Sequence, residues 1–239
     1  MTDFVAIDLE TANPNPWSIC QIGVAAFCQG ALSQEWMTYL DPEERFNKDN
    51  VAVHGITEAA VRGWPTLPGV ADHLSELLNG RIVVSHSQFD RVALDRAFDR
   101  RQIHRLDCSW LDSAQVARRA WQGLSKRGFG LENLCRLLGY RYQRHDALGD
   151  AKAAGIVVLA AIEQTGVGLA DWLRQVEQPV GDGPGKPIRP LSVMPPGTVN
   201  TAASEIARPS NRIISAELLS LLPEQRVDKS NDRQSSLSS

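Results

Sequence analysis

The pattern of apolar residues changes along this chain, and the change limits the folds open to it. Residues 3–10 (DFVAIDLE) form a short apolar run that ends in acids, and residues 19–42 contain two further runs that turn at Gln29 and Gly30. These runs have the length and composition of strands. From residue 66 onward, segments with helical spacing alternate with short apolar runs. Strands first, then strands and helices in alternation, predict an α/β domain with a mixed sheet.

The second part of the domain contains the expected helices. An amphipathic segment that a glycine stops predicts the first helix, and a run of small and branched residues predicts the longest. Short apolar segments between the helices predict the remaining strands. The helices are expected at 66–80, 89–101, 111–121, 131–140 and 147–166, and the strands at 81–87 and 105–110.

The distribution of aromatic residues predicts where the folded domain ends. Trp172 is the last aromatic residue, and residues 179–239 contain 8 of the 13 prolines but no Phe, Trp, Tyr, Cys or His. Such a segment cannot bury enough apolar surface to offset its ordering entropy. We therefore expect one domain at 1–178 and a mostly disordered tail at 179–239. Within the tail, the Leu and Ile spacing of residues 214–224 fits either a partner-docking helix or a transient one.

Composition argues against secretion and membrane insertion. The four cysteines form no C-x-x-C pair, as expected of reduced thiols in a cytosolic protein. The first ten residues, MTDFVAIDLE, lack the basic region and the apolar length of a signal peptide. The longest apolar stretch, residues 153–162, is too short to cross a bilayer. These features predict a cytoplasmic protein with no membrane partner.

The formal net charge of −3 hides an uneven distribution. Residues 1–90 carry a formal charge of −8, and residues 91–144 carry +7. The basic segment also contains aromatic residues, which is typical of a surface that faces phosphates and stacks on bases. Solvated helix faces over ordinary core aromatics produce the same pattern, and the sequence does not separate the two interpretations.

Two acids end the first expected strand. Asp8 and Glu10 are two residues apart, so in a strand their carboxylates project from the same face. Carboxylates this close repel each other and favour a cation beside them, and oxygen ligands suit Mg²⁺. A second Asp-x-Glu, from Asp41 to Glu43, falls in an expected turn. Only the first pair ends an apolar strand, where paired acids have no structural use.

Two further acids lie at expected helix starts. Asp90 follows the apolar strand at 81–87, where an acid that stabilises the helix dipole is the alternative interpretation. Asp150 lies on a helix of small residues that would pack tightly on a sheet. His145 precedes this helix in an expected loop. A rigid helix would fix the aspartate, while the loop would let the histidine close over bound substrate.

These motifs occur in a characteristic order: Asp-x-Glu on a first strand, Asp after a central strand, then His-x4-Asp entering a late helix. This order resembles the DEDDh 3′–5′ exonucleases. The resemblance covers about residues 1–165 and includes the segments FVAIDLETAN, CQIG, NVAVHGIT, SHSQFD, LENLCRLLGY and HDALGDA. The segments DLETAN and VHGIT are most similar to the epsilon-type proofreading exonucleases of bacterial DNA polymerase III.

The resemblance implies a ribonuclease H-like fold, with a mixed five-stranded sheet whose second strand is antiparallel and which helices flank. It implies that His145 is the general base that takes a proton from the attacking water. A histidine suits this role because it titrates near neutral pH. Two Mg²⁺ or Mn²⁺ ions would clamp the oxygens of an in-line displacement. Their ligands would be Asp8, Glu10, Asp90 and Asp150.

The resemblance also implies a pocket for the terminal nucleotide. At one of its positions, Ser87, relatives often have Asn, and the shorter side chain puts substrate affinity in doubt. The pocket residues would be Thr11, His54, Gly55, Ile56 and Ser87.

The expected function is a metal-dependent 3′–5′ exonuclease that acts on single-stranded nucleic acid and releases nucleoside 5′-monophosphates. DNA is favoured, in replication proofreading or repair, and a DNA polymerase partner is expected through the tail. An exoribonuclease that trims RNA 3′ ends is the alternative within the same fold.

Two alternatives belong to other classes. A haloacid-dehalogenase-like phosphatase requires D-x-D-x-T after its first strand, whereas this chain has Glu10 and Ala12 at the third and fifth positions. A non-catalytic, polymerase-associated interaction subunit would be expected to have lost an acid or the histidine. All five residues are present.

Overall fold

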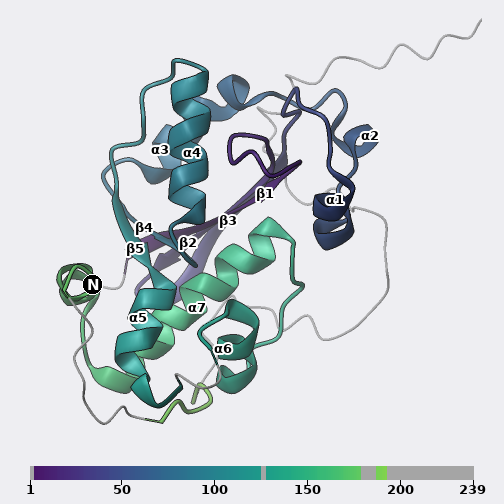
Figure 1. Ribbon diagram of the computed structural model, residues 1–239. Helices are drawn as coiled ribbons and strands as arrows, with labels where there is room; N and C mark the ends of the chain where they lie inside the picture. The colour runs from purple at the N-terminus through teal and green to yellow at the C-terminus, as the bar shows by residue number, and fades with distance from the viewer. Residues whose placement is uncertain (1–2, 125–127, 179–186, 193–239) are drawn as a thin grey trace, which may run out of the picture.

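Figure 1 shows the computed structural model, which describes residues 3–124, 128–178 and 187–192. The five strands form one mixed sheet in the order β3-β2-β1-β4-β5. β2 is antiparallel to β1 and β3, whereas β1, β4 and β5 are parallel. The predicted mixed five-stranded sheet with an antiparallel second strand is therefore confirmed. The strands are β1 (Phe4–Thr11), β2 (Ile19–Cys28), β3 (Ala31–Tyr39), β4 (Ile82–Ser85) and β5 (Ser109–Asp112).

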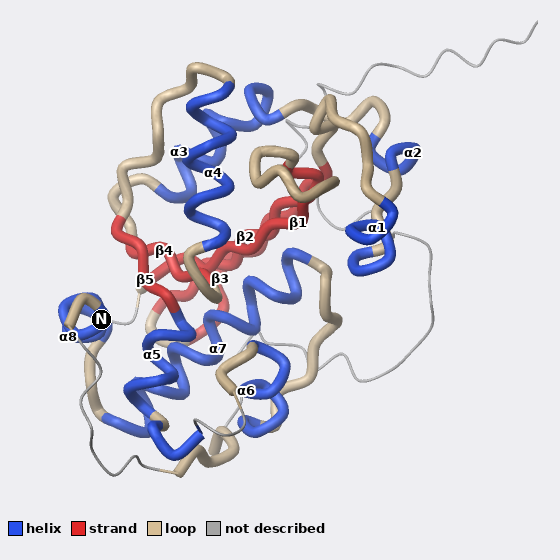
Figure 2. Tube along the Cα trace, viewed as in Figure 1, coloured by secondary structure: helices blue, strands red, loops and turns tan. Residues whose placement is uncertain are grey.

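Helices cover both faces of the sheet, as Figure 2 shows. Alternation along β1 separates two cores, because Phe4 and Ala6 face one helical layer while Val5 and Ile7 face the other. The layer over Val5 and Ile7 consists of α3 (Ala71–Leu78) and α4 (Phe89–Arg100). The opposite layer consists of α5 (Ser113–Ala120), α6 (Leu131–Leu138), α7 (Ala147–Thr165) and α8 (Leu169–Val176).

The hairpin between β2 and β3 turns where the sequence predicts it. Gln29 and Gly30 both have positive φ, 51° and 79°, as a two-residue turn between twisted strands requires. The expected helix at 66–80 is instead divided into a 3₁₀ turn, η1 (Leu67–Val70), followed by α3. Pro68 and Gly69 lie in η1 and explain the division, because neither residue favours a continuous α-helix.

Three short helices were not expected from the pattern: α1 (Lys48–His54), α2 (Glu58–Val61) and α8. α1 has no buried residue, so it lacks an apolar period that could reveal it. Side-chain N-caps stabilise α1 and α2 instead. Asn47 accepts from the Asp49 N–H at the start of α1, and Thr57 accepts from the Ala60 N–H at the start of α2. A short 3₁₀ turn, η2 (Gln122–Leu124), follows α5.

The longest helix, α7, lies across β1 and β2 and is buried along most of its length. Small residues let it approach the sheet. At Gly155, an added Cβ would lie 2.3 Å from Cε2 of Phe27. Of the helices in the described part of the chain, none alone has the length and apolar composition to cross a membrane, although α7 and α8 pass that test as a pair bent by 102°.

Residues 187–192, which belong to the expected tail, pack on the domain. The Leu191 N–H donates to the Leu138 carbonyl at 3.1 Å, at the end of α6. The Gln164 side chain bonds both the N–H and the carbonyl of Arg189. The rest of the expected tail, including the segment at 214–224, lies outside the described residues.

Candidate active site

The two acids of β1 lie on the face that α7 covers. Asp8 and Glu10 continue the alternation of Phe4 and Ala6, so their side chains point toward the α7 layer. β1 pairs with β4 only at Val5 and Ala6. The acids therefore lie beyond the paired part of that edge, where there is room for other groups.

Asp90 reaches this edge from the first turn of α4. Its side chain is 3% exposed, and its Oδ1 accepts from the Leu9 N–H at 3.1 Å. That N–H lies on the part of β1 that β4 leaves unpaired. The N-cap of α4 is Gln88, and Asp90 lies in the first turn, where an acid also suits the helix dipole, as the alternative interpretation expected. The carboxylate in addition links the start of α4 to the acid-bearing strand.

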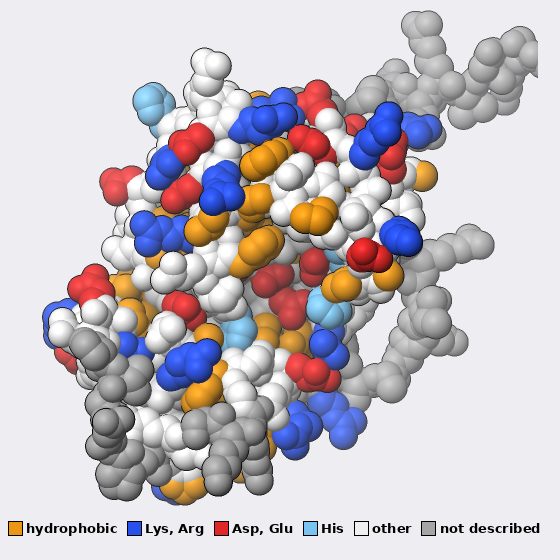
Figure 3. All heavy atoms as spheres, in the orientation of Figure 1, with side chains coloured by type: hydrophobic (Ala, Val, Ile, Leu, Met, Phe, Trp, Pro, Cys, Tyr) orange, Lys and Arg blue, Asp and Glu red, His pale blue; other side chains and the backbone are white. Residues whose placement is uncertain are grey.

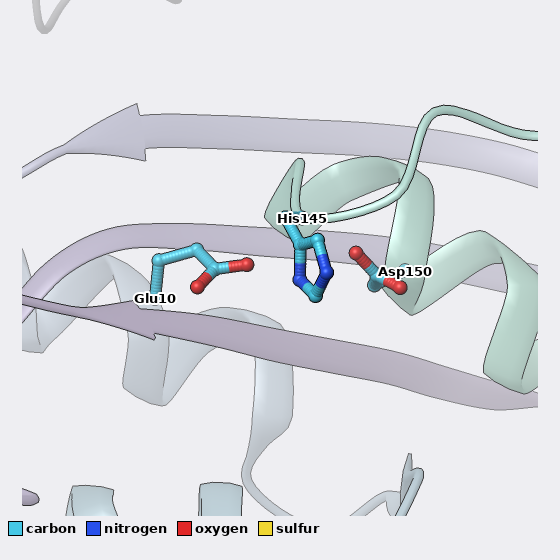
Figure 4. A group of neighbouring side chains, drawn as sticks. All are labelled: Glu10, His145 and Asp150. Carbon is cyan, nitrogen blue, oxygen red and sulfur yellow. The ribbon is translucent and has the colours of Figure 1, made fainter. Parts of the chain in front are cut away.

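Asp150 and His145 approach from the start of α7. Asp150 is in the first turn, and its carboxylate is hydrogen-bonded by the Tyr142 side chain and the His145 backbone. His145 lies in the turn before the helix, as predicted, with a φ of 56°. This left-handed conformation is unfavourable for a residue with a Cβ. Figure 4 shows the imidazole between the carboxylates of Glu10 and Asp150.

The four carboxyl groups form one cluster, in which the charges of neighbouring carboxyls raise one another's pKa. Burial is the largest cause of a raised pKa in each of them, and it brings the pKa of Glu10 and that of Asp90 to about 7. The charges of Asp90, Asp150 and Glu10 further raise the pKa of Asp8. Hydrogen bonds from the His145 backbone and Tyr142 partly offset the raised pKa of Asp150. Figure 3 shows acidic side chains gathered in a hollow of this face, with histidine beside them.

These groups fit a divalent cation. One ligand atom from each of Glu10, His145 and Asp150 lies within 4.8 Å of the others. Oδ2 of Asp150 is buried and has no hydrogen-bond partner among the described residues. A cation would satisfy that oxygen and remove the repulsion between the acids. Asp8 and Asp90 lie outside this compact group but interact with it through their charges.

Sequence reasoning missed two residues that support the cluster. Tyr142 bonds Asp150, and no local pattern singles it out. Asp146 is the N-cap of α7, where its Oδ2 accepts from the Gly149 N–H at 3.1 Å. Its charge also helps to raise the pKa of Glu10. Its place directly before an expected helix was a readable capping signal.

Four of the five residues proposed for the nucleotide pocket, namely Thr11, His54, Gly55 and Ile56, lie at or beside the end of β1. His54 Nδ1 accepts from the Ile56 N–H at 3.0 Å, so Nε2 carries the ring proton and donates to the Thr11 carbonyl at 3.1 Å. Burial lowers the pKa of His54. Gly55 ends α1 with a φ of 76°, and Asn50 donates to the same Thr11 carbonyl at 2.9 Å. The motif thus fastens α1 to the strand that bears the acids.

Ile56 and Ser87 differ in their surroundings. Ile56 is 6% exposed and packs in a small core with Ala12 and Val61. Ser87 has a φ of 130°, a conformation in which side chains are strained. Its hydroxyl accepts from the Phe89 N–H at 3.2 Å, which supports the start of α4.

Many cations of the basic segment have local partners. Arg101 pairs with Glu43 at 2.5 Å, and Arg105 pairs with Asp99 at the same distance. The Arg119 guanidinium donates to backbone carbonyls at the end of α8, among them that of Val176 at 3.1 Å. These contacts favour the interpretation as solvated, paired helix faces for much of the segment.

The fold and the acid cluster define a class of protein. The chain belongs to the Exonuclease (RNase_T) family, whose pattern matches residues 5–158. With four acids and a histidine in this order, it is a member of the DEDDh exonucleases in the ribonuclease H-like superfamily.

Curated relatives support this membership. A Mycobacterium tuberculosis (strain CDC 1551 / Oshkosh) protein, named as a candidate bifunctional exonuclease/endonuclease, is 31% identical over 69% of this chain and 27% of its own length. The 3′-5′ exonuclease DinG of Bacillus subtilis (strain 168) is 26% identical over 67% of this chain and 18% of its own length. The epsilon subunit of DNA polymerase III of Escherichia coli (strain K12) is 28% identical over 67% of this chain and 71% of that subunit. This chain therefore matches only a minor part of the first two relatives.

Solved structures support the fold. Exonuclease X in complex with 5′ overhanging duplex DNA has a TM-score of 0.58 at 21% identity, over 72% of this chain and 98% of that one. E. coli exonuclease I in complex with a dT13-containing oligonucleotide has the same TM-score at 18% identity, over 69% of this chain and 41% of that one.

Proposed function

We propose that this chain is a divalent-metal-dependent 3′–5′ exonuclease of single-stranded 3′ ends, with DNA as the favoured substrate. One observation carries the proposal: Asp8, Glu10, Asp90 and Asp150 come from three separate elements and repel one another in one buried to half-buried cluster beside His145. A fold does not collect uncompensated carboxylates for stability, because burial without a partner costs free energy. The cluster is therefore best explained by a cationic ligand.

The four acids would hold two Mg²⁺ or Mn²⁺ ions, which oxygen ligands suit. When bound, such ions supply positive charge against the phosphate and both oxygens of an in-line displacement. His145 takes one proton from the attacking water, whose oxygen forms the new bond to phosphorus. The bond from phosphorus to the 3′ oxygen of the preceding nucleotide breaks, and that oxygen takes up a proton. The products are a nucleoside 5′-monophosphate and a strand with a free 3′-hydroxyl.

The position of His145 supports its role as the base. The residue lies in a turn rather than inside α7, and its strained φ gives the turn a reason to change conformation when substrate binds. Thr11, His54, Gly55, Ile56 and Ser87 would surround the terminal nucleotide.

The relatives support the 3′–5′ direction of cleavage and DNA as the substrate. DinG is named a 3′-5′ exonuclease, and the epsilon subunit belongs to a DNA polymerase. Structures of exonucleases X and I contain DNA. These relatives and similar structures support a role in proofreading or repair. We expect a contact with a polymerase in the tail, which lies outside the described residues.

A cleavage assay with 5′-labelled single-stranded DNA and RNA in Mg²⁺ tests the proposal. The wild type should give a ladder that shortens one nucleotide at a time, faster on DNA. Asp150→Ala should abolish the ladder, and His145→Ala should slow it by about 10²–10⁴-fold, the usual contribution of a general base. Asp41→Ala is the matched control, because Asp41 belongs to the second Asp-x-Glu and its side chain accepts from the Glu43 N–H in a surface turn, away from the acid cluster.

Each contrary outcome has a definite meaning. Cleavage that persists in Asp150→Ala, or cuts inside the strand, would contradict the proposal. Faster shortening of RNA would replace the favoured substrate with the alternative one. A wild type that binds DNA but never shortens it would favour the non-catalytic interaction subunit.

A further inference from the structure

Two residues of β2 lie opposite the two acids of β1. The register pairs Asp8 with Gly23 and Glu10 with Gln21. Directly opposed residues of an antiparallel pair project from the same face of the sheet. Gln21 and Gly23 therefore share the face that bears the acids, and α7 begins on this face.

Gln21 is hydrogen-bonded to the start of α7. Its side chain is 2% exposed, and its Oε1 accepts from the Ala147 N–H at 3.0 Å. Ala147 is the first residue of α7, whose N–H has no partner within the helix. Nε2 of Gln21 lies 3.4 Å from Oδ1 of Asp146, the N-cap. Without this side chain, a buried N–H would be left unpaired, which costs free energy.

Gly23 lets the helix start come this close. A Cβ on Gly23 would lie 2.2 Å from the Ala147 carbonyl carbon and 2.2 Å from the Leu148 nitrogen. No real contact is that short, so the backbone of α7 occupies the space that a side chain would fill. The helix start thus lies directly on the β2 backbone at Gly23. Gln21, two residues away on the same strand, bonds this helix start.

We propose that Gln21 is a positioning residue that sets the distance between the acids of β1 and those of α7. Ala147 is three residues before Asp150 and two after His145, on or beside the same first turn. A shift of this turn along the sheet moves both groups relative to Glu10, whereas Asp8 and Glu10 stay fixed in β1. The inference rests on the proposed function, because it assigns Gln21 a role in that same site.

The test is a comparison of Gln21→Met with Gln164→Met in the full chain. Methionine preserves the length of the side chain and removes its hydrogen bonds. Gln164 lies near the other end of α7, where it bonds Trp121 and Arg189. Both substitutions remove buried or half-buried hydrogen bonds from the same helix, so both should lower the unfolding temperature. Only Gln21→Met disturbs the end that carries the site.

Manganese binding, measured by calorimetry without substrate, separates the two variants. Gln21→Met should weaken Mn²⁺ binding about 10-fold, the typical effect of losing a residue that orients metal ligands. It should lower kcat by a similar factor and change KM for DNA by less than about threefold. Gln164→Met should keep wild-type Mn²⁺ affinity and kcat. Equal Mn²⁺ affinity in the two variants would overturn the inference.

A measurement on the wild type keeps the inference testable if Gln21→Met does not fold. Amide hydrogen exchange of Ala147 should be slow, because its N–H is bonded to a buried oxygen, although the first amides of a helix usually exchange quickly. Fast exchange at Ala147 would overturn the inference. Failure of the proposed function looks different, because the wild type itself would then bind no Mn²⁺ or cut no DNA.

Discussion

The two ends of α7 belong to one rigid helix and are built in opposite ways. At the far end, Gly166 ends the helix with a φ of 75°, its N–H bonds the Ile162 carbonyl, and Gln164 bonds Trp121 and Arg189. At the near end, His145 adopts a left-handed φ that glycine would adopt more easily, and Oδ2 of Asp150 is buried without a hydrogen-bond partner among the described residues. At the far end these polar groups are bonded, whereas the near end leaves a carboxylate oxygen of Asp150 open for a ligand.

This difference places the unfavourable features of α7 at the end that carries the candidate site. The raised pKa of Asp150, its buried oxygen without a hydrogen-bond partner in the described ranges, and the strained φ of His145 all occur at one end of one helix. The same helix is anchored elsewhere by apolar packing across β1 and β2. The far end and the middle hold the near end in a conformation that it would not favour alone.

The largest effect is expected from filling the space between β2 and the start of α7. Gly23→Ala places a Cβ 2.2 Å from the Ala147 backbone, which cannot move without moving the site. We expect a loss of about 1–3 kcal/mol in the free energy of unfolding, the usual cost of overpacking, together with loss of Mn²⁺ binding. Denaturant titration and calorimetry measure the two effects.

Gly155→Ala is the matched control for this substitution. Its Cβ would lie 2.3 Å from the Phe27 ring, so a similar loss of stability is expected in the middle of the same helix. Mn²⁺ binding should survive, because the site end does not move. Equal loss of Mn²⁺ binding in both variants would show that the two parts of α7 are not independent.

The metal-free protein should become less stable as the pH rises. Burial and repulsion raise the pKa of Glu10 and Asp90 to about 7, whereas carboxyl groups of an unfolded chain have a pKa near 4. The folded state therefore binds these protons more tightly, and the stability that they contribute is lost as the pH rises through about 7. In EDTA, the unfolding temperature should fall by several degrees between pH 6 and pH 8, since 1 kcal/mol shifts a domain of this size by about 2–4 °C.

Asp90→Asn sharpens this test, because it removes one of the two carboxyls, those of Glu10 and Asp90, whose pKa is about 7. The fall in unfolding temperature between pH 6 and pH 8 should become smaller, and the metal-free variant should be more stable than the wild type at pH 8. Excess Mn²⁺ at pH 8 should raise the unfolding temperature of the wild type alone. A pH dependence that Asp90→Asn leaves unchanged would place the titrating groups elsewhere.

A smaller effect is expected when the hydroxyl that bonds Asp150 is removed. Tyr142→Phe keeps the ring, which stacks on Tyr140 at 6.0 Å, and deletes the hydrogen bond to the carboxylate. Mn²⁺ affinity should fall by up to about 10-fold, with little change in stability. Tyr140→Phe deletes the neighbouring hydroxyl and should leave Mn²⁺ affinity unchanged. Calorimetric titrations of the two variants would contradict this assignment if both, or neither, bound Mn²⁺ more weakly.

The smallest effects on stability are expected at His145 and Gly166, the two residues that flank α7 and have a left-handed backbone conformation. Gly166→Ala should lower the free energy of unfolding by about 1 kcal/mol and leave cleavage intact, because alanine is strained at a φ of 75°. His145→Gly should relieve strain at 56° and change stability by no more than about 0.5 kcal/mol, while cleavage slows by about 10²–10⁴-fold. Stability and cleavage should thus respond separately at the two ends. Parallel losses in both variants would contradict the contrast between the ends.

Much of the fold could be read from local pattern. The run at 3–10, the turn at Gln29 and Gly30, and the small-residue helix at 147–166 correspond closely to β1, the hairpin turn and α7. Boundaries were less certain where the signals were mixed. The strand expected at 105–110 is found at Ser109–Asp112, as β5. Asp112 is both the last residue of this strand and the N-cap of α5, so the strand extends directly to the helix.

The acids of the candidate site could also be found from the sequence, but most of the residues that support them could not. Asp8, Glu10, Asp90, His145 and Asp150 occur in motifs whose order is recognisable. Gln21 and Tyr142 act through contacts with residues 126 and 8 positions away, and no periodicity predicts such contacts. A glycine inside a buried strand, as at Gly23, is the one signal that could have indicated a close approach of another backbone.

The sequence by itself determined most of the strands and longer helices and indicated which acids belong to the candidate site, because periodicity, caps and residue type act locally. Only the tertiary structure decided that the Asp90 carboxylate also bonds the Leu9 N–H of β1. It also decided that residues 187–192 return to the ends of α6 and α7. The physical reason is that register and helix docking depend on the total burial of many distant residues, which no short stretch of sequence contains.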